Sequence, residues 1–255
     1  MPRIISEFLT ATDRNIPVIL TYHEHCSNAP MVLLNHGTGG DAVGMQRLAL
    51  RLANKEVFCV SVDAYQQGSR IIDRFNDLYF NENNSLEYKE NYLRMLLHMA
   101  QDMSALIDYF TDDERADTSR VGMTGDSQGG YVAYMTMSKD ARIKAAAPLI
   151  GSPDLRDKYG NSPEFHDLPQ TLQQEINQHN PINNYTQISK TALLIQNGDA
   201  DKIVPVSGVR KLNDKIKDLY KDRPDDYKYI EYPGMGHTTT HEMNMRAIEW
   251  LVEKL

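Results

Sequence analysis

The chain has 255 residues, of which 41% are hydrophobic and 24% are charged, as in ordinary globular domains. Its net charge of −8 argues against nucleic acid or an anionic membrane surface as the main partner. The first residues, MPRIISEFLT, show no apolar segment followed by a cleavage site, and no apolar run approaches the roughly 20 residues that cross a bilayer. Together with the two cysteines, Cys26 and Cys59, these features predict a cytoplasmic protein without a disulfide framework.

Short apolar segments rich in β-branched residues alternate with helical patterns along the chain. RIISEFL (3–9) and PVILTYHE (17–24) predict two early strands with a turn at TDRN between them. The remaining elements are predicted, in chain order, as strand 31–35, helix 43–54, strand 57–62, helix 86–111, strand 120–124, helix 128–138, strands 145–150, 192–196 and 227–232, and helices 206–220 and 240–254. Thr239 is the expected N-cap of the last helix, with Glu242 completing a capping box.

This alternation predicts a mostly parallel central sheet with helices on both faces. The exception is segment 151–190, which is rich in Asn, Gln, Pro and Asp and has one amphipathic stretch around Leu168, Leu172 and Ile176. A segment with so few apolar residues could hardly bury a core of its own. We therefore expect a single domain over residues 1–255, with 151–190 as a small cap insertion over the edge of the sheet.

The stretch TGDSQGG, Thr124 to Gly130, follows a predicted strand and opens a predicted helix. This is the context of a nucleophile elbow, G-x-S-x-G, in which a strained turn lifts the serine hydroxyl above the sheet. Gly125 and Gly129 would let the strand and the helix pack closely around Ser127. The motif alone is weak evidence, so the prediction depends on whether partners for the serine follow in the right order.

Two later loops supply such partners. NGDADKIVP follows the predicted strand ALLIQ, and PGMGHTTTH follows the predicted strand YKYIEY. The order Ser, then Asp, then His is that of α/β-hydrolases, and both loops leave the carboxyl ends of predicted parallel strands. A histidine can accept the proton of the serine, and an acid can orient that histidine.

The chain resembles an α/β-hydrolase, and more narrowly the small bacterial serine esterases grouped with dienelactone-hydrolase-like and prolyl-oligopeptidase-like hydrolases. The resemblance covers nearly the whole chain through LLNHGTGG, TGDSQGGY, LIGSPD, NGDADKIVP, PGMGH and the C-terminal AIEWLVEKL. It implies an α/β-hydrolase fold and a catalytic triad of Ser127, Asp201 and His237. It also implies an oxyanion hole made by the backbone N–H groups of Thr38 and Gln128.

The resemblance also separates these residues from their neighbours. The pattern G-x-x-D-x-x-V-P matches Asp201, which leaves Asp199 to stabilise the turn. The histidine of the motif H-G-x, His36, is structural in the family. His241 is expected to be a surface or capping residue.

No metal site or organic cofactor is expected. His237 and His241 are spaced like two metal ligands, but no third ligand completes a zinc pattern, and His23, His25 and Cys26 lie far from the motifs in sequence. One residue departs from many relatives, which carry His, Tyr, Phe or a small residue where this chain has Asp126. A carboxylate there would disfavour anionic acyl groups or raise the pKa of His237, whereas the simpler interpretation is a side chain that bonds to backbone.

These features predict hydrolysis of a small-molecule carboxylic ester, with neither nucleic acid nor membrane as a partner. The polar segment 151–190 offers few aromatic side chains, Tyr159, Phe165 and Tyr185, and so favours acyl groups of about two to four carbons. The lactone substrate of dienelactone hydrolases is not carried over, because those enzymes use a cysteine nucleophile. Alternatives are a cinnamoyl or feruloyl esterase, a thioesterase, a small peptidase or a non-catalytic binding protein on the same fold, and a homodimer is one option for the oligomeric state.

Overall fold

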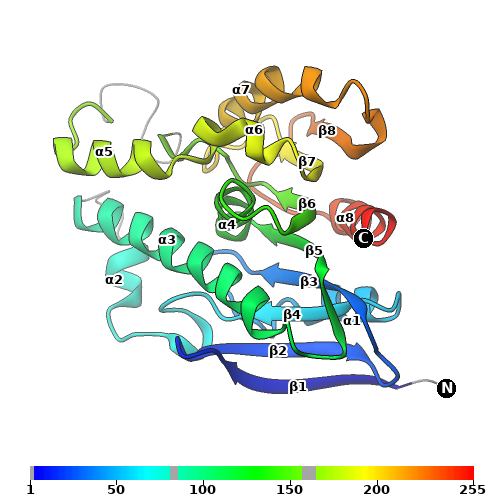
Figure 1. Cartoon of the computed structure of the whole chain (residues 1–255). Helices are drawn as coiled ribbons and strands as arrows, with labels where there is room; N and C mark the ends of the chain where they lie inside the picture. The colour runs from blue at the N-terminus through cyan, green and yellow to red at the C-terminus, as the bar shows by residue number, and fades with distance from the viewer. Residues whose placement is uncertain (1–2, 81–85, 157–164) are drawn as a thin grey trace.

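The computed structural model describes residues 3–80, 86–156 and 165–255 (Figure 1). Within these residues, eight strands form one sheet with the order β1-β2-β4-β3-β5-β6-β7-β8. The strands are β1 (Ile4–Ala11), β2 (Ile16–His23), β3 (Ala29–Asn35), β4 (Phe58–Val62), β5 (Ala116–Asp126), β6 (Ile143–Leu149), β7 (Ala192–Gly198) and β8 (Tyr227–Tyr232). The predicted fold class, an α/β-hydrolase fold with a mostly parallel sheet, is confirmed.

One strand, β2, runs in the opposite direction to the other seven strands of the sheet. β1 and β2 form an antiparallel hairpin, and β2 also runs antiparallel to β4, while every pairing from β4 to β8 is parallel. The loops that follow β3, β4, β5, β7 and β8 therefore emerge at the same edge of the sheet, where open α/β sheets bind ligands.

Helices cover both faces of the sheet. The α-helices are α1 (Gln46–Ala53), α2 (Phe75–Tyr79), α3 (Leu86–Tyr109), α4 (Gln128–Met137), α5 (Gln170–His179), α6 (Tyr185–Ile188), α7 (Ser207–Ile216) and α8 (His241–Lys254), and the 3-10 turns are η1 (Gly68–Arg70), η3 (Pro181–Asn184), η4 (Lys217–Tyr220) and η5 (Pro224–Asp226). α1 and α8 pack on one face, and the main core, with α2, α3, α4 and α7, lies on the other (Figure 1).

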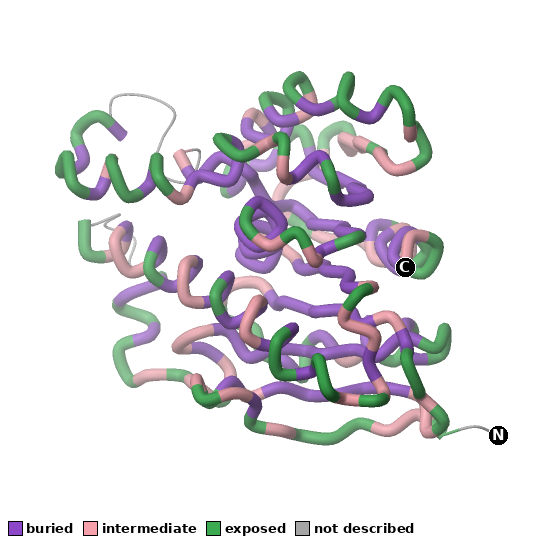
Figure 2. The backbone as a smooth tube through the Cα atoms, viewed as in Figure 1, coloured by how far each residue is buried: buried purple, intermediate pink, exposed green. Residues whose placement is uncertain are grey.

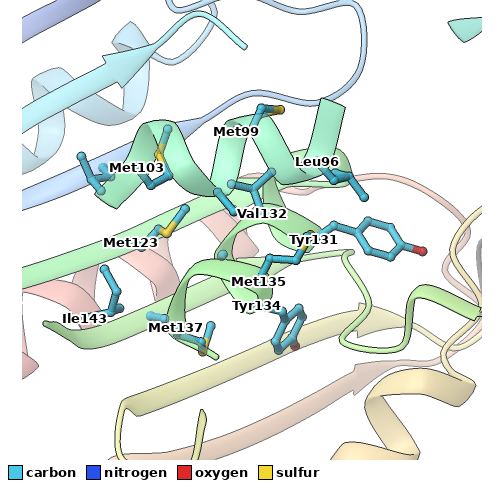
Figure 3. Packing of buried hydrophobic residues seen from close by; sticks show 14 of the residues in the cluster. Leu96, Met99, Met103, Met123, Tyr131, Val132, Tyr134, Met135, Met137 and Ile143 are labelled. Atoms are coloured by element: carbon cyan, nitrogen blue, oxygen red, sulfur yellow. The ribbon is translucent and has the colours of Figure 1, made fainter. Parts of the chain in front are cut away.

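Burial follows the layers of the fold. The central strands β3, β4, β6 and β7 are almost wholly buried and β5 is buried from Val121 to Gly125, whereas the edge strand β1 is largely exposed (Figure 2). All ten residues of α4 are buried, because this helix lies between the sheet and α3. Its Val132 and Met135 pack among Met99 and Met103 of α3 (Figure 3). The helix that carries the elbow is thus fixed by dense apolar packing.

The structure differs from the predicted elements in several places. β5 begins at Ala116, earlier than predicted, because the polar start of this strand pairs with β3 before a bulge at Pro30. The five-residue α2 has no pattern long enough to be noticed. The predicted helix 206–220 ends as α7 at Ile216 and continues as the 3-10 turn η4.

A further difference is a correction at the last helix. Thr240, not Thr239, is the N-cap of α8, since its side-chain oxygen accepts a hydrogen bond from the Met243 N–H at 3.2 Å. Glu242 then falls one position too early to complete a capping box. Three consecutive threonines made the position of the cap ambiguous in the sequence.

The predicted cap segment joins the main core in the residues that the structure describes. Leu172 and Ile176 of α5 are buried in the same cluster as the interior of the sheet, and α5 contacts α3. Residues 157–164, including Tyr159, one of the aromatic candidates of this segment, lie outside the described part of the chain.

Candidate active site

Ser127 lies on a sharp turn between β5 and α4. Its φ of 53° and ψ of −111° are strained for a residue with a side chain, and its N–H donates to the Leu149 carbonyl of β6 at 2.9 Å. A Cβ at Gly125 or at Gly129 would lie only 2.5 or 2.3 Å from the Asn35 carbonyl oxygen of β3. The two glycines therefore permit the close approach that the elbow requires.

The structure brings Ser127, His237 and Asp201 together in one hydrogen-bonded chain. His237 Nε2 lies 2.8 Å from Ser127 Oγ, and His237 Nδ1 lies 2.7 Å from Asp201 Oδ2. The Asp201 side chain is 0% exposed and that of His237 is 17% exposed. The arrangement allows His237 to accept the serine proton at Nε2 while its Nδ1–H donates to the buried carboxylate.

The loop after β7 holds the Asp201 carboxylate in place. Asp201 Oδ1 accepts hydrogen bonds from the backbone N–H groups of Ile203 at 2.8 Å and Val204 at 2.9 Å. The second oxygen, Oδ2, is then the one directed at His237. The neighbouring Asp199 instead accepts from the Gly234 N–H at 2.6 Å, which joins the loop after β7 to the loop after β8.

The other histidines of the motifs have different surroundings. His36 is buried, its Nε2 accepts from the Ala64 N–H at 3.1 Å, and its Nδ1 lies 2.7 Å from the Gly37 carbonyl oxygen, so it supports the loop after β3. His241 is exposed at the first residue of α8. Among the described residues, no group of three or more His, Cys, Asp or Glu side chains could hold a metal ion.

Two backbone N–H groups are available for a developing oxyanion. Thr38 follows β3 and lines the cavity above Ser127, and Gln128 is the first residue of α4. Within residues 3–80, 86–156 and 165–255, neither amide N–H donates a hydrogen bond. The N-terminus of α4 adds the positive end of a helix dipole.

Behind these two donors lies a network of buried side-chain amides that the motifs do not include. Gln67, on the loop after β4, accepts from the Gly39 N–H at 2.7 Å and donates to Gln128 Oε1 at 2.9 Å. Thr38 Oγ1 donates to the same Gln128 oxygen at 2.9 Å. Gln67 was not predicted from the sequence; the signal available was its place in a polar loop directly after a buried strand.

Asp126 lies against the loop after β3 and faces two cavities. A Cβ on Gly37 would lie 3.0 Å from Asp126 Oδ2, and Asp126 lines both the cavity above Ser127 and a neighbouring one. Burial raises the pKa of the Asp126 carboxyl, an effect that His36 and His237 partly offset. No side chain among the described residues forms an ion pair with it.

The cavity above Ser127 has a volume of about 550 Å³ and an aromatic wall. The wall consists of Tyr79, Phe80, Tyr88 and Tyr92, and Ile150, Ile203 and Val204 add apolar surface. Of the described residues in 151–190, none lines this cavity, so neither Phe165 nor Tyr185, the described aromatic candidates of that segment, contributes to its lining. Those two side chains pack in or against the main core instead.

The chain is similar to known proteins over most of its length. Residues 82–254 match the model of the prolyl oligopeptidase family. The chain is 23% identical over 232 residues to "Putative esterase YitV" of Bacillus subtilis (strain 168), covering 87% of this chain and 88% of that protein. Across the described residues, no helix combines the length and apolarity needed to cross a bilayer.

Two solved structures share the fold over nearly the whole chain. One is TT1662 from Thermus thermophilus, with a TM-score of 0.78, 19% identity and 98% coverage of both chains. The other is the "Putative Dienelactone Hydrolase from Klebsiella pneumoniae subsp. pneumoniae MGH 78578", with a TM-score of 0.68, 14% identity and coverage of 98% of this chain and 99% of that chain. Because the family model matches more than half of the residues, the chain belongs to the prolyl oligopeptidase family of α/β-hydrolases.

Proposed function

We propose that this protein is a serine esterase that cleaves carboxylic esters of small molecules through an acyl-enzyme intermediate. The observation that carries the proposal is the unbroken hydrogen-bond chain from Ser127 through His237 to Asp201, at the floor of a cavity large enough for a substrate. The name of the Bacillus relative supports an ester as the substrate.

The first half of the reaction acylates the serine. Ser127 Oγ attacks the ester carbonyl carbon while His237 Nε2 takes the hydroxyl proton. The negative charge that moves to the carbonyl oxygen is stabilised by the N–H groups of Thr38 and Gln128. When the carbonyl re-forms, the bond to the alcohol oxygen breaks, and His237 returns the proton to that leaving oxygen.

The second half releases the acyl group. Water loses a proton to His237 Nε2 as its oxygen attacks the acyl carbon, and the same two N–H groups stabilise the second oxyanion. The bond to Ser127 Oγ then breaks, and His237 returns the proton to the serine. Asp201 orients the imidazole and stabilises its cationic form in both halves.

The free thiols of Cys26 and Cys59 support a cytoplasmic location, where such cysteines stay reduced.

The aromatic wall favours a second candidate within the same chemistry. The expectation of acyl groups of two to four carbons rested on a polar lining, whereas the cavity is walled by four aromatic rings. Offset or edge contacts between aromatic rings add roughly 0.5–1.5 kcal/mol to the burial of their area. We therefore propose that the cavity also accepts aromatic acyl groups, as a cinnamoyl or feruloyl esterase does.

Substrate panels with wild type and Ser127→Ala test the proposal. One panel contains p-nitrophenyl esters from acetate to laurate and a feruloyl ester, and the others contain acyl thioesters and peptidyl p-nitroanilides. The proposal requires Ser127-dependent hydrolysis in which esters exceed anilides and thioesters in kcat/KM. A preference for peptidyl anilides would identify a peptidase. Absence of turnover on every panel would favour a non-catalytic binding protein.

A further inference from the structure

We propose that Gln67 is a positioning residue that sets the geometry of the oxyanion hole by joining its two halves through its side-chain amide. The inference rests on the proposed function. The first half is the loop after β3, with Thr38 and Gly39, and the second is the start of α4 at Gln128. Gln67 bonds to both halves and belongs to neither.

The orientation of each amide in the network follows from one fixed donor. The Gly39 N–H can only donate, so the Gln67 atom 2.7 Å away is the carbonyl oxygen Oε1. The Gln67 NH₂ group then faces Gln128, which must present its own oxygen, and the Thr38 hydroxyl donates to that oxygen as well. A flipped amide at either glutamine would oppose two donors or two acceptors.

The remaining amide hydrogens point into the apolar core. Gln67 Nε2 lies 3.0 Å from Met95 Sδ, and Gln128 Nε2 lies 3.3 Å from Met99 Sδ. Both sulfurs belong to α3, whose packing against α4 is visible around Met99 (Figure 3). Gln67 is 1% exposed and Gln128 is 0% exposed, so the hydrogen bond between their side chains is shielded from bulk solvent and strengthened by the low local polarity.

The loop after β4 is built to deliver the Gln67 side chain. Gln66 and Gly68, on either side, have φ values of 61° and 59°. Asp63 Oδ2 accepts from the Ser69 N–H at 2.9 Å, while Asp63 Oδ1 accepts from the Ala42 N–H at 2.7 Å, which ties this loop to the loop after β3. Gln66 is not a glycine, so its left-handed backbone conformation beside the buried Gln67 amide is strained. Strain of this kind is commonly retained at functional sites.

Fixing both halves matters because oxyanion donors act by preorganisation. The Thr38 and Gln128 N–H groups stabilise the transition state only at the spacing of the oxyanion, and they stabilise the neutral carbonyl of the substrate less. Loosening their spacing should therefore lower kcat more than it raises KM. A variant that only lost overall stability would not lower kcat more than it raises KM.

The test is Gln67→Met, which keeps the volume of the side chain and removes both hydrogen-bonding groups that face Gly39 and Gln128. Gln128→Met is the second variant, because it removes the side-chain amide and keeps the backbone N–H. The matched control is Gln196→Met. Gln196 is also 0% exposed and also makes two hydrogen bonds, to the Met243 carbonyl and the Tyr232 hydroxyl, but it does not contact the oxyanion loop.

The readout is a pair of matched inhibitors. An aryl trifluoromethyl ketone is attacked by Ser127 and places an oxyanion in the hole, whereas the corresponding methyl ketone binds without forming a stable adduct. We expect Gln67→Met and Gln128→Met to lower kcat for p-nitrophenyl butyrate about 10- to 50-fold, less than the loss of a whole donor. The affinity for the trifluoromethyl ketone should fall by a similar factor, with KM and the methyl ketone affinity changed less than about threefold.

The inference is overturned if Gln67→Met or Gln128→Met lowers the affinity for both ketones equally. It is also overturned if neither variant lowers kcat. The control Gln196→Met, if it lowers either affinity, should lower both equally. A drop in melting temperature shared by all three variants leaves this criterion intact, because the ratio of the two ketone affinities is measured on folded protein. Failure of the proposed function would look different: wild type would show no Ser127-dependent ester hydrolysis at all.

Discussion

The floor and the wall of the candidate active site are built in different ways. The floor consists of Ser127, Asp201 and His237, on loops that leave three strands of the sheet, and buried hydrogen bonds hold it. The wall consists of aromatic side chains from α2, from the residue that follows it, Phe80, and from the start of α3, and Phe80 is 54% exposed. A floor of this kind suits chemistry that tolerates little displacement, whereas an exposed wall can change with the substrate.

This difference indicates that separate sets of residues carry the reaction and the substrate selectivity of this molecule. Substitutions in the floor should remove the reaction for every substrate. Substitutions in the wall should change the order of substrates and leave the reaction. The following substitutions test whether the reaction and the substrate selectivity depend on separate residues.

The largest effect is expected for Ser127→Ala. Removal of the nucleophilic oxygen should lower kcat by about 10⁴-fold or more for every ester, while the melting temperature stays near that of wild type. Activity within tenfold of wild type would mean that Ser127 is not the nucleophile. Circular dichroism and steady-state kinetics on the same sample check both parts.

The acid of the floor is tested by Asp201→Asn. The amide should keep the shape of the loop but favour the wrong tautomer of His237, for a loss of kcat on the order of 10³- to 10⁴-fold. Asp199→Asn is the matched control, since this carboxylate bonds to the Gly234 N–H and not to His237. The control should cost far less, and the reverse order would show that the wrong carboxylate was assigned.

The wall is tested by Phe80→Ala. This variant should lower kcat/KM for a feruloyl ester about five- to tenfold, through loss of one ring contact and its apolar area. Acetate hydrolysis should change less than about twofold. Phe8→Ala is the control, because Phe8 is 81% exposed on β1 and lies outside this cavity. Equal losses on both esters would mean that the wall belongs to the machinery of the reaction.

The smallest effect concerns Asp126, at the border of floor and wall. No Lys or Arg lines the cavity in the described residues, so the Asp126 carboxylate should disfavour anionic acyl groups. A charge several Å away is worth on the order of 1 kcal/mol at a partly wet site, so Asp126→Asn should improve hydrolysis of a hemisuccinate ester relative to a neutral ester about three- to tenfold. No change in that ratio would leave Asp126 without a role in selectivity.

Ionisation of Asp126 should make both the stability of the protein and its selectivity against anionic acyl groups depend on pH. Because burial raises the pKa of Asp126, ionisation is unfavourable in the folded state. Stability should therefore fall as the pH rises from the unfolded-state pKa through the folded-state pKa. Asp126→Asn should raise the melting temperature at pH 8 more than at pH 4, and the gain in hemisuccinate hydrolysis should vanish as the pH falls through the pKa of Asp126. A shift of melting temperature that is equal at both pH values would contradict this.

The sequence predicted the floor much better than the wall. β6, β7 and β8 lie within two residues of their predicted bounds. β6 and β7 are buried parallel strands, which are continuous apolar segments between polar loops, whereas the edge strand β8 is marked by its β-branched and aromatic residues. The order of Ser127, Asp201 and His237 at strand ends is a local pattern, and the structure brings these three side chains into contact, although their catalytic role stays a prediction. The role of the Thr38 and Gln128 N–H groups as oxyanion donors also stays a prediction.

The wall and the amide network could not be predicted for a physical reason. Tyr79 and Tyr92 both line the cavity above Ser127, and Tyr79 does so from a five-residue helix between β4 and α3. No periodicity marks a helix so short. Gln67 lies on the loop after β4, and its contacts depend on a backbone N–H of the loop after β3 and on side chains of α3 and α4. Such contacts follow from tertiary packing, which a single glutamine in a polar loop does not reveal.

The most direct test of the central claim is labelling with a fluorophosphonate, followed by mass mapping of the modified peptide. Wild-type protein should gain one phosphonyl group, located on the oxygen of Ser127, because only a serine activated by a neighbouring base reacts rapidly with this reagent. His237→Ala should slow the labelling by about 10³-fold or more, since it removes the base and leaves the serine. A label on any other residue, or labelling of His237→Ala at the wild-type rate, would contradict a hydrolase that works through Ser127, His237 and Asp201.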